Sequence, residues 1–133
     1  MNLKRYIDAA VRRETRRVFF FRDTMLDTVI NNLKKCYSDI FNSSLKQKDK
    51  DDTLYGLKSL VSHVIKGKST NNPNELQVSA MLAQKLNERL KNSSSTTFED
   101  DMLKRKVSAK LVSSVYELKN IATDIYLENL DKG

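Results

Sequence analysis

Six of the chain's eight arginines lie in its first 22 residues, and four of them form the run RRETRR at residues 12–17. Guanidinium groups bind phosphate and carboxylate through paired hydrogen bonds, whereas a lysine offers a hydrated point charge. Residues 1–22 hold seven basic and two acidic residues, which is a net charge of +5 within a chain of net charge +7. This uneven charge indicates an anionic partner, either nucleic acid or an acidic protein surface.

Phe20 lies among these arginines when the segment is projected as a helix. Each helical residue turns by about 100°. If Val11, Val18 and Met25 face a core, Phe20 faces the opposite side. The candidate binding face consists of this phenylalanine and the arginines around it: Arg5, Arg12, Arg13, Arg16, Arg17 and Phe20.

Two functions fit this face. In the first, the helix docks a protein partner, with Phe20 as the apolar anchor and the arginines on acidic groups, as in protein hot spots. In the alternative, the arginines contact nucleic-acid phosphates and Phe20 stacks on a base. The plain interpretation is that Phe20 is covered within the chain and the arginines are solvated. A membrane surface fits less well, because the face has one large apolar residue.

Arg22 shows the opposite anomaly, because the same projection places it on the core side between Val18 and Leu26. An unpaired charge is too unfavourable to remain buried there. The sequence therefore predicts that Arg22 is paired, with an acidic residue of another helix as a candidate, and it does not identify that residue.

Residues for catalysis are scarce. His63 is the only histidine and lies between apolar residues of a helix, where a packing role is the usual one. No zinc-binding pair or phosphate-binding glycine loop occurs. The acidic residues at 49–52 and 99–101 fall at expected helix starts, where they oppose the helix dipole. We expect no enzyme activity, no metal and no cofactor.

The composition indicates one globular domain over residues 1–133. Apolar residues make up 39% and charged residues 31%, and only three glycines and one proline interrupt long helices. No apolar run is long enough for a membrane span. The single cysteine and the lack of a secretory signal indicate an intracellular protein, cytoplasmic or nuclear. A mitochondrial presequence is the alternative, weakened by Asp8 and Glu14.

The expected fold is all-α: an antiparallel bundle of about four helices with long first and last members. The helices are expected over residues 3–41, 52–66, 73–91 and 98–130. The first would be roughly 58 Å long at ~1.5 Å per residue. It must therefore kink near residues 22–24 or project beyond its neighbours.

Capping residues give the expected helix ends. Asp51 or Asp52 would begin the second helix, and Gly67 would end it in a left-handed conformation. Asn72 would cap the third helix, with Pro73 at its first position. Thr96 and Glu99 have capping-box spacing for the last helix.

The apolar residues of the later helices give the expected core. The second helix should bury Leu54, Leu57, Val61, Val64 and Ile65, and the third Leu76, Ala80, Ala83, Leu86 and Leu90. The last helix has a near-heptad seam of Leu103, Val107, Leu111, Val115, Leu118, Ala122 and Ile125. Tyr116 and Tyr126 are expected at the edge of this core. Because the two short helices leave apolar surface uncovered, self-association is expected as well.

Overall fold

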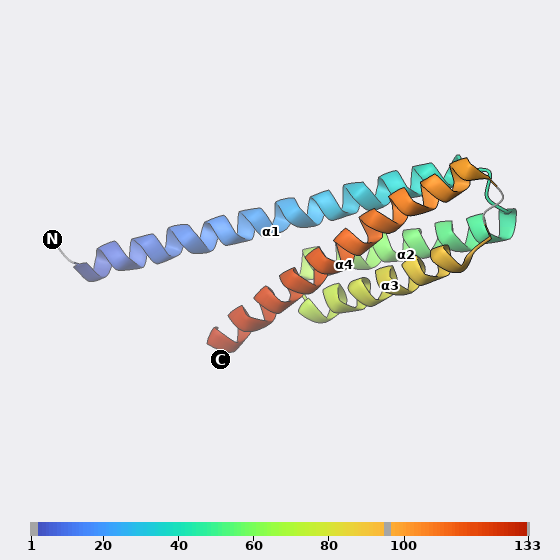
Figure 1. Ribbon diagram of the computed structural model, residues 1–133. Coiled ribbons are helices and arrows are strands. Elements are labelled where there is room, and N and C mark those ends of the chain that lie inside the picture. Colours follow the sequence, from blue (N-terminus) through green and yellow to red (C-terminus); the bar gives the residue numbers. More distant parts are fainter. Residues whose placement is uncertain (1–2, 95–96, 133) are drawn as a thin grey trace.

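The protein is described by a computed structural model. Its described residues form four helices: α1 (Leu3–Phe41), α2 (Gln47–Thr70), α3 (Pro73–Asn92) and α4 (Phe98–Lys132). The structure describes the backbone of residues 3–94 and 97–132 and the side chains of residues 22–94 and 97–131, and these ranges contain no strand. Successive helices run in opposite directions (Figure 1). The predicted all-α antiparallel bundle is confirmed.

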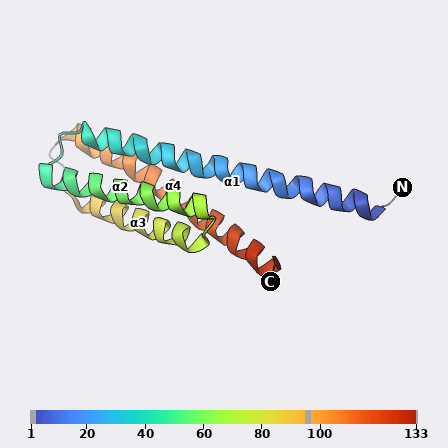
Figure 2. The same ribbon diagram turned by 180° about the vertical axis from the view of Figure 1, so that it is seen from behind.

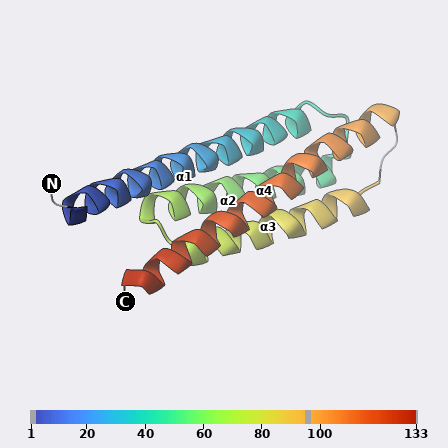
Figure 3. The ribbon, with the colours of Figure 1, turned by 60° about the vertical axis from the view of Figure 1, so that its left-hand side comes forward.

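The helices form a closed ring of neighbours. α1 packs against α2 and α4, and α3 packs against the same two helices. The view in Figure 3 shows α4 running antiparallel to both of its neighbours. The buried apolar residues of all four helices and Leu45 of the first loop make one core.

α1 is much longer than this core requires. It contains 39 residues, against 24 in α2 and 20 in α3. It continues as one helix past the ends of α2 and α3, and it diverges from α4 toward its own N-terminus (Figures 1 and 2). Of the two expectations for its length, projection beyond the neighbouring helices is the one observed.

The buried seam of α1 differs from the predicted one at Met25. Among the described side chains, the seam has steps of four and three residues: Arg22, Leu26, Val29, Leu33, Cys36 and Ile40. Met25 was expected to face the core but is 38% exposed, so that prediction is wrong. The reason is that Leu26 occupies the seam, and its neighbour Met25 is turned by ~100° to one side.

α2 begins earlier than predicted, at Gln47 instead of Asp51 or Asp52. Lys46 precedes the first turn without a side-chain capping bond. The side-chain amide Nε2 of Gln47 donates to Asp51 Oδ1 over 2.7 Å, an i,i+4 contact within the helix. Leu45, immediately before the helix, is buried in the core. α2 thus starts after a buried apolar residue and without an acidic cap.

Gly67 does not end α2, because the helix continues to Thr70. A Cβ atom at Gly67 would lie 2.6 Å from Leu76 Cδ2 of α3, so the glycine allows the two helices to approach closely. The left-handed residue is Asn71, with φ of 51°. The next amide, Asn72 N–H, bonds the Gly67 carbonyl over 3.1 Å. Asparagine therefore performs the termination expected of glycine.

The caps of the last two helices are side-chain oxygens. Asn72 Oδ1 accepts from the Asn74 amide over 2.9 Å, with Pro73 at the first position of α3, as predicted. Thr96, the predicted cap of α4, lies outside the described residues. Thr97 Oγ1 accepts from the Asp100 amide over 3.0 Å, so Thr97 caps this helix.

The predicted buried faces are largely confirmed, with errors on α2 and α4. All five predicted residues of α3 are buried, as are five of the seven on α4. On α2, Leu60 is fully buried and was missed, whereas Ile65 is 48% exposed. On α4, Tyr116 and Tyr126 are 67% and 56% exposed, so their placement at the core edge is wrong. The buried face of α4 consists of other residues.

Candidate functional site

All six residues of the candidate binding face lie on one part of α1, between Arg5 and Phe20. This part belongs to the stretch that extends past the ends of α2 and α3 (Figure 1). The helical backbone places these residues along one continuous helix. Their side chains lie outside the described part of the chain. A single projecting helix therefore presents the whole basic segment.

The same side of α1 can be followed into the region with described side chains. The helical projection puts Thr24, Asp27 and Asn31 in line with the expected direction of Phe20. All three are exposed. The outward direction derived from the sequence is thus correct where α1 lies in the bundle.

Arg22 marks the point where α1 leaves the bundle. Its side chain is only 5% exposed, and its guanidinium donates to Glu128 Oε1 of α4. A second nitrogen, Nη1, lies 3.5 Å from Oδ1 of Asn71 in the turn between α2 and α3. The predicted pairing of Arg22 with an acidic residue of another helix is confirmed, and the residue is Glu128.

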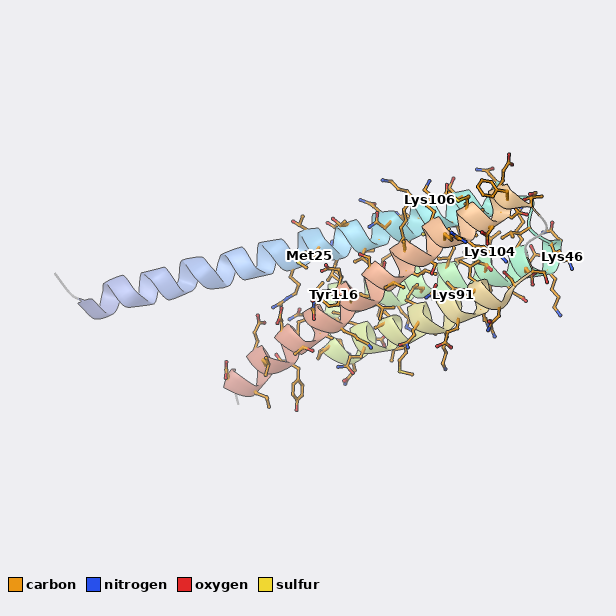
Figure 4. The ribbon with its side chains drawn as sticks, viewed as in Figure 1. Met25, Lys46, Lys91, Lys104, Lys106 and Tyr116 are labelled. Atoms are coloured by element: carbon orange, nitrogen blue, oxygen red, sulfur yellow. The ribbon has the colours of Figure 1, made fainter. Side chains whose placement is uncertain are left out.

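A second ion pair lies beside this junction. Lys68 Nζ near the end of α2 donates to Asp27 Oδ1 of α1. This hydrogen bond raises the pKa of Lys68. Met25 lies between Arg22 and Asp27 in the sequence, and Figure 4 shows it near the level at which α2 ends and α3 begins. Polar contacts to three elements therefore fix α1 where its projecting part begins.

His63 serves a structural contact between α2 and α3. Its Nδ1 lies 3.0 Å from Glu75 Oε2, and Lys66 Nζ lies 3.3 Å from Glu75 Oε1. The hydrogen bonds from His63 and Lys66 lower the pKa of Glu75. The partly buried position predicted for His63 is confirmed, and its contact with α3 is polar.

Cys36 lies on the buried face of α1 and has no exposed surface. Burial raises the pKa of its thiol to about 11. The thiolate is the reactive form of cysteine, and the thiol therefore stays protonated and unreactive at neutral pH.

One surface hollow is lined mostly by charged side chains. A hollow of about 590 Å³ lies between the start of α2 and the end of α3, lined by three basic residues and three acidic ones: Lys48, Lys85, Arg89, Asp49, Asp52 and Glu88. Among the described residues, no group of three histidine, cysteine or acidic side chains is placed to hold a metal ion. None of the helices, over the same residues, has the length and apolar character to cross a membrane.

The candidate site therefore consists of the projecting basic segment of α1, fixed at its base by Arg22. Comparison of the chain with protein-family models, with curated proteins and with solved structures finds no match.

Proposed function

We propose that this chain is a non-catalytic interaction module that docks an acidic protein surface through the projecting segment of α1. Phe20 is the apolar anchor, and Arg13, Arg16 and Arg17 contact acidic groups of the partner. The observation that supports this most is the position of the basic segment on a helix that extends past α2 and α3 (Figure 1).

The charge of the segment favours an anionic partner. Residues 3–21 contain six basic and two acidic residues. Five of the six are arginines, which bind carboxylates in a bidentate manner. This helix would therefore attract an acidic surface during encounter and then form directional hydrogen bonds with it.

The position of the segment outside the bundle favours binding by a helix. Most helical stability in proteins comes from packing of one face against other elements. α2 and α3 end before this segment (Figure 2). A partner that packs along it would supply packing contacts, and the segment would be docked as a helix.

The anchoring at Arg22 favours a preorganised segment. The contacts of Arg22 to Glu128 and Asn71 orient α1 where it leaves the bundle. Orientation before binding reduces the entropy lost in the complex.

The spacing of the aromatic residues on the basic face favours protein over nucleic acid. Single-stranded nucleic acid is usually bound on several aromatic side chains that stack successive bases. The helical projection gives the basic face two aromatic residues, Phe20 and Tyr6, which lie roughly 21 Å apart along the helix axis, too far to stack successive bases. One aromatic anchor surrounded by arginines is typical of a protein hot spot.

The test is retention of partners from a nuclease-treated lysate on the immobilised full chain. The variants are Phe20→Ala and the triple reversal Arg13→Glu, Arg16→Glu, Arg17→Glu. The matched control reverses three exposed lysines of the bundle: Lys34, Lys35 and Lys58. We expect a retained protein that both site variants lose and the control keeps, with direct binding then measured on the purified pair.

Salt separates the two functions. Binding to nucleic acid through several arginines weakens steeply with salt concentration. A labelled oligonucleotide that binds with this salt dependence and is lost in the triple reversal would favour the nucleic-acid alternative. If neither the protein fraction nor the oligonucleotide responds to the triple reversal, both functions are excluded.

A further inference from the structure

The outer face of α4 has a second apolar seam, opposite its core seam. Ten positions follow one another in alternating steps of four and three residues: Phe98, Met102, Arg105, Ala109, Val112, Tyr116, Lys119, Thr123, Tyr126 and Leu130. The six large apolar residues among them are 50% to 78% exposed. This is the heptad spacing of a helix that packs along a second helix. α4 therefore has one seam for the bundle and one for a partner outside it.

We infer that the partner is a second copy of this chain, and that the two α4 helices pair antiparallel about a two-fold axis. A two-fold contact requires a surface that is complementary to itself, so that residue i meets residue j and residue j meets residue i. The outer seam of α4 meets this requirement in one alignment, centred between Val112 and Tyr116.

In this alignment apolar residues meet apolar residues. Three layers pair large side chains of the two copies: Phe98 with Leu130, Met102 with Tyr126, and Val112 with Tyr116. The other two layers pair a basic residue with an uncharged one: Arg105 with Thr123, and Lys119 with Ala109. No layer therefore brings two charges together.

A heptad shift in either direction leaves no layer that pairs two large apolar side chains. Moving one helix by a heptad in either direction places Lys119 of one copy against Met102 or Tyr116 of the other. Each shift replaces contacts between large apolar side chains by contacts with polar or small ones, and so it buries less apolar surface. The seam thus selects one antiparallel alignment.

A parallel pair is disfavoured by the same two basic residues. Parallel helices in register place each seam residue opposite its own copy. Arg105 would then face Arg105, and Lys119 would face Lys119. Like charges placed against each other oppose association, so the charge pattern favours the antiparallel pair.

The size of the seam suits a stable contact. From Phe98 to Leu130 it extends roughly 48 Å at ~1.5 Å per residue. Seam and flanking positions give about 20 residues on each side, which falls in the range of standard protein interfaces. Tyr116, 67% exposed, lies midway along α4 (Figure 4), where the energetically dominant residues of an interface cluster.

This pairing is independent of the proposed function, because it uses α4 and not the projecting segment of α1. It adds one geometric consequence. α1 runs antiparallel to α4 (Figure 1), so an antiparallel pair of α4 helices directs the two basic segments in opposite directions. The dimer would present one basic segment at each end.

The first test is the mass of the full chain in sedimentation velocity over a range of concentrations. We expect the mass of two chains for the wild type and of one chain for Val112→Glu/Tyr116→Glu. The matched control places two glutamates at exposed apolar positions of α3, Val78→Glu/Met81→Glu, and should remain a dimer. Circular dichroism checks that each variant is folded, and Val112→Ser/Tyr116→Ser gives a milder second disruption.

The second test establishes the direction of the pair with a short bis-maleimide. Ser113 flanks the two-fold axis and is exposed, so Ser113→Cys should be cross-linked to its own copy. Thr123 is also exposed but would lie roughly 27 Å along the axis from its copy, so Thr123→Cys should not be cross-linked. The wild type, whose Cys36 is buried, is the control for background reaction.

Three results would overturn the inference. The first is a wild type that stays monomeric at every concentration. The second is a dimer that keeps its mass in both the glutamate and the serine variants. The third is efficient cross-linking through Thr123→Cys, which would show a parallel pair.

Discussion

The two long helices exceed the bundle in different ways. α1 exceeds it in length, because its N-terminal part extends past the ends of α2 and α3 (Figure 2). α4 exceeds it in apolar surface, because it has a buried seam on one face and an exposed seam on the other. The projecting segment of α1 is basic, and the outer seam of α4 is mostly apolar. The two surfaces should therefore serve different contacts and respond to different substitutions.

The largest effect is expected at the inner seam of α4. Leu118 has no exposed surface, so Leu118→Ala removes packed atoms and leaves a cavity. We expect the free energy of unfolding to fall by about 2–5 kcal/mol. On the outer face, the adjacent Lys119→Ala should change it by no more than ~0.5 kcal/mol. Urea unfolding at low protein concentration measures both values, and equal losses would contradict the assignment of the two faces.

The next effect is expected where α1 leaves the bundle. Arg22→Ala leaves the Glu128 carboxylate without its charged donor and should lower the free energy of unfolding by about 1.5–3 kcal/mol. The control is Lys106→Ala, which removes a side chain that is 62% exposed and pairs with Asp39, and it should cost no more than ~1 kcal/mol. A double-mutant cycle with Glu128→Gln measures the coupling of the buried pair. Unchanged stability in Arg22→Met together with zero coupling would refute a structural role for this arginine.

A third effect separates the inner and outer faces of α1. Burial raises the pKa of Cys36 from 9.0 to about 11, which reduces the thiolate fraction near pH 8 by about 100-fold. We expect Cys36 to react with a disulfide reagent at least 100-fold more slowly in the folded chain than in urea. Ser38→Cys, an exposed position two residues away, should add one fast thiol. Fast reaction of Cys36 in the folded wild type would show that this face of α1 is open.

The smallest effect concerns the contact between α2 and α3, away from the projecting segment of α1 and from the outer seam of α4. The pKa of Glu75 lies below its ordinary value of 4.5, because His63 and Lys66 bond its carboxylate. A lowered folded-state pKa stabilises the fold above pH 4.5, and this contribution is lost as the pH falls through the folded-state pKa. Glu75→Gln should therefore be slightly less stable than the wild type at pH 7, and the difference should disappear in acid. A difference that grows below pH 4 would contradict this assignment.

The sequence was sufficient for the fold and for the inward position of Arg22, because both follow from helical periodicity. It was insufficient where two helices meet. Gly67 resembles a helix end in isolation, but the approach of Leu76 explains its small size within the helix. Tyr116 and Tyr126 resemble core residues because periodicity shows that a face is apolar but not which helix covers it. The partner of Arg22 depends on how α4 crosses α1, which only the packed structure gives.

The most direct test of this division between the two long helices compares the solution masses of three full-length proteins. They are the wild type, Val112→Glu/Tyr116→Glu on α4, and Arg13→Glu/Arg16→Glu/Arg17→Glu on α1. The account predicts two chains for the wild type and for the arginine variant, and one chain for the α4 variant. A monomeric wild type, or an arginine variant that dissociates while the α4 variant remains a dimer, would contradict it.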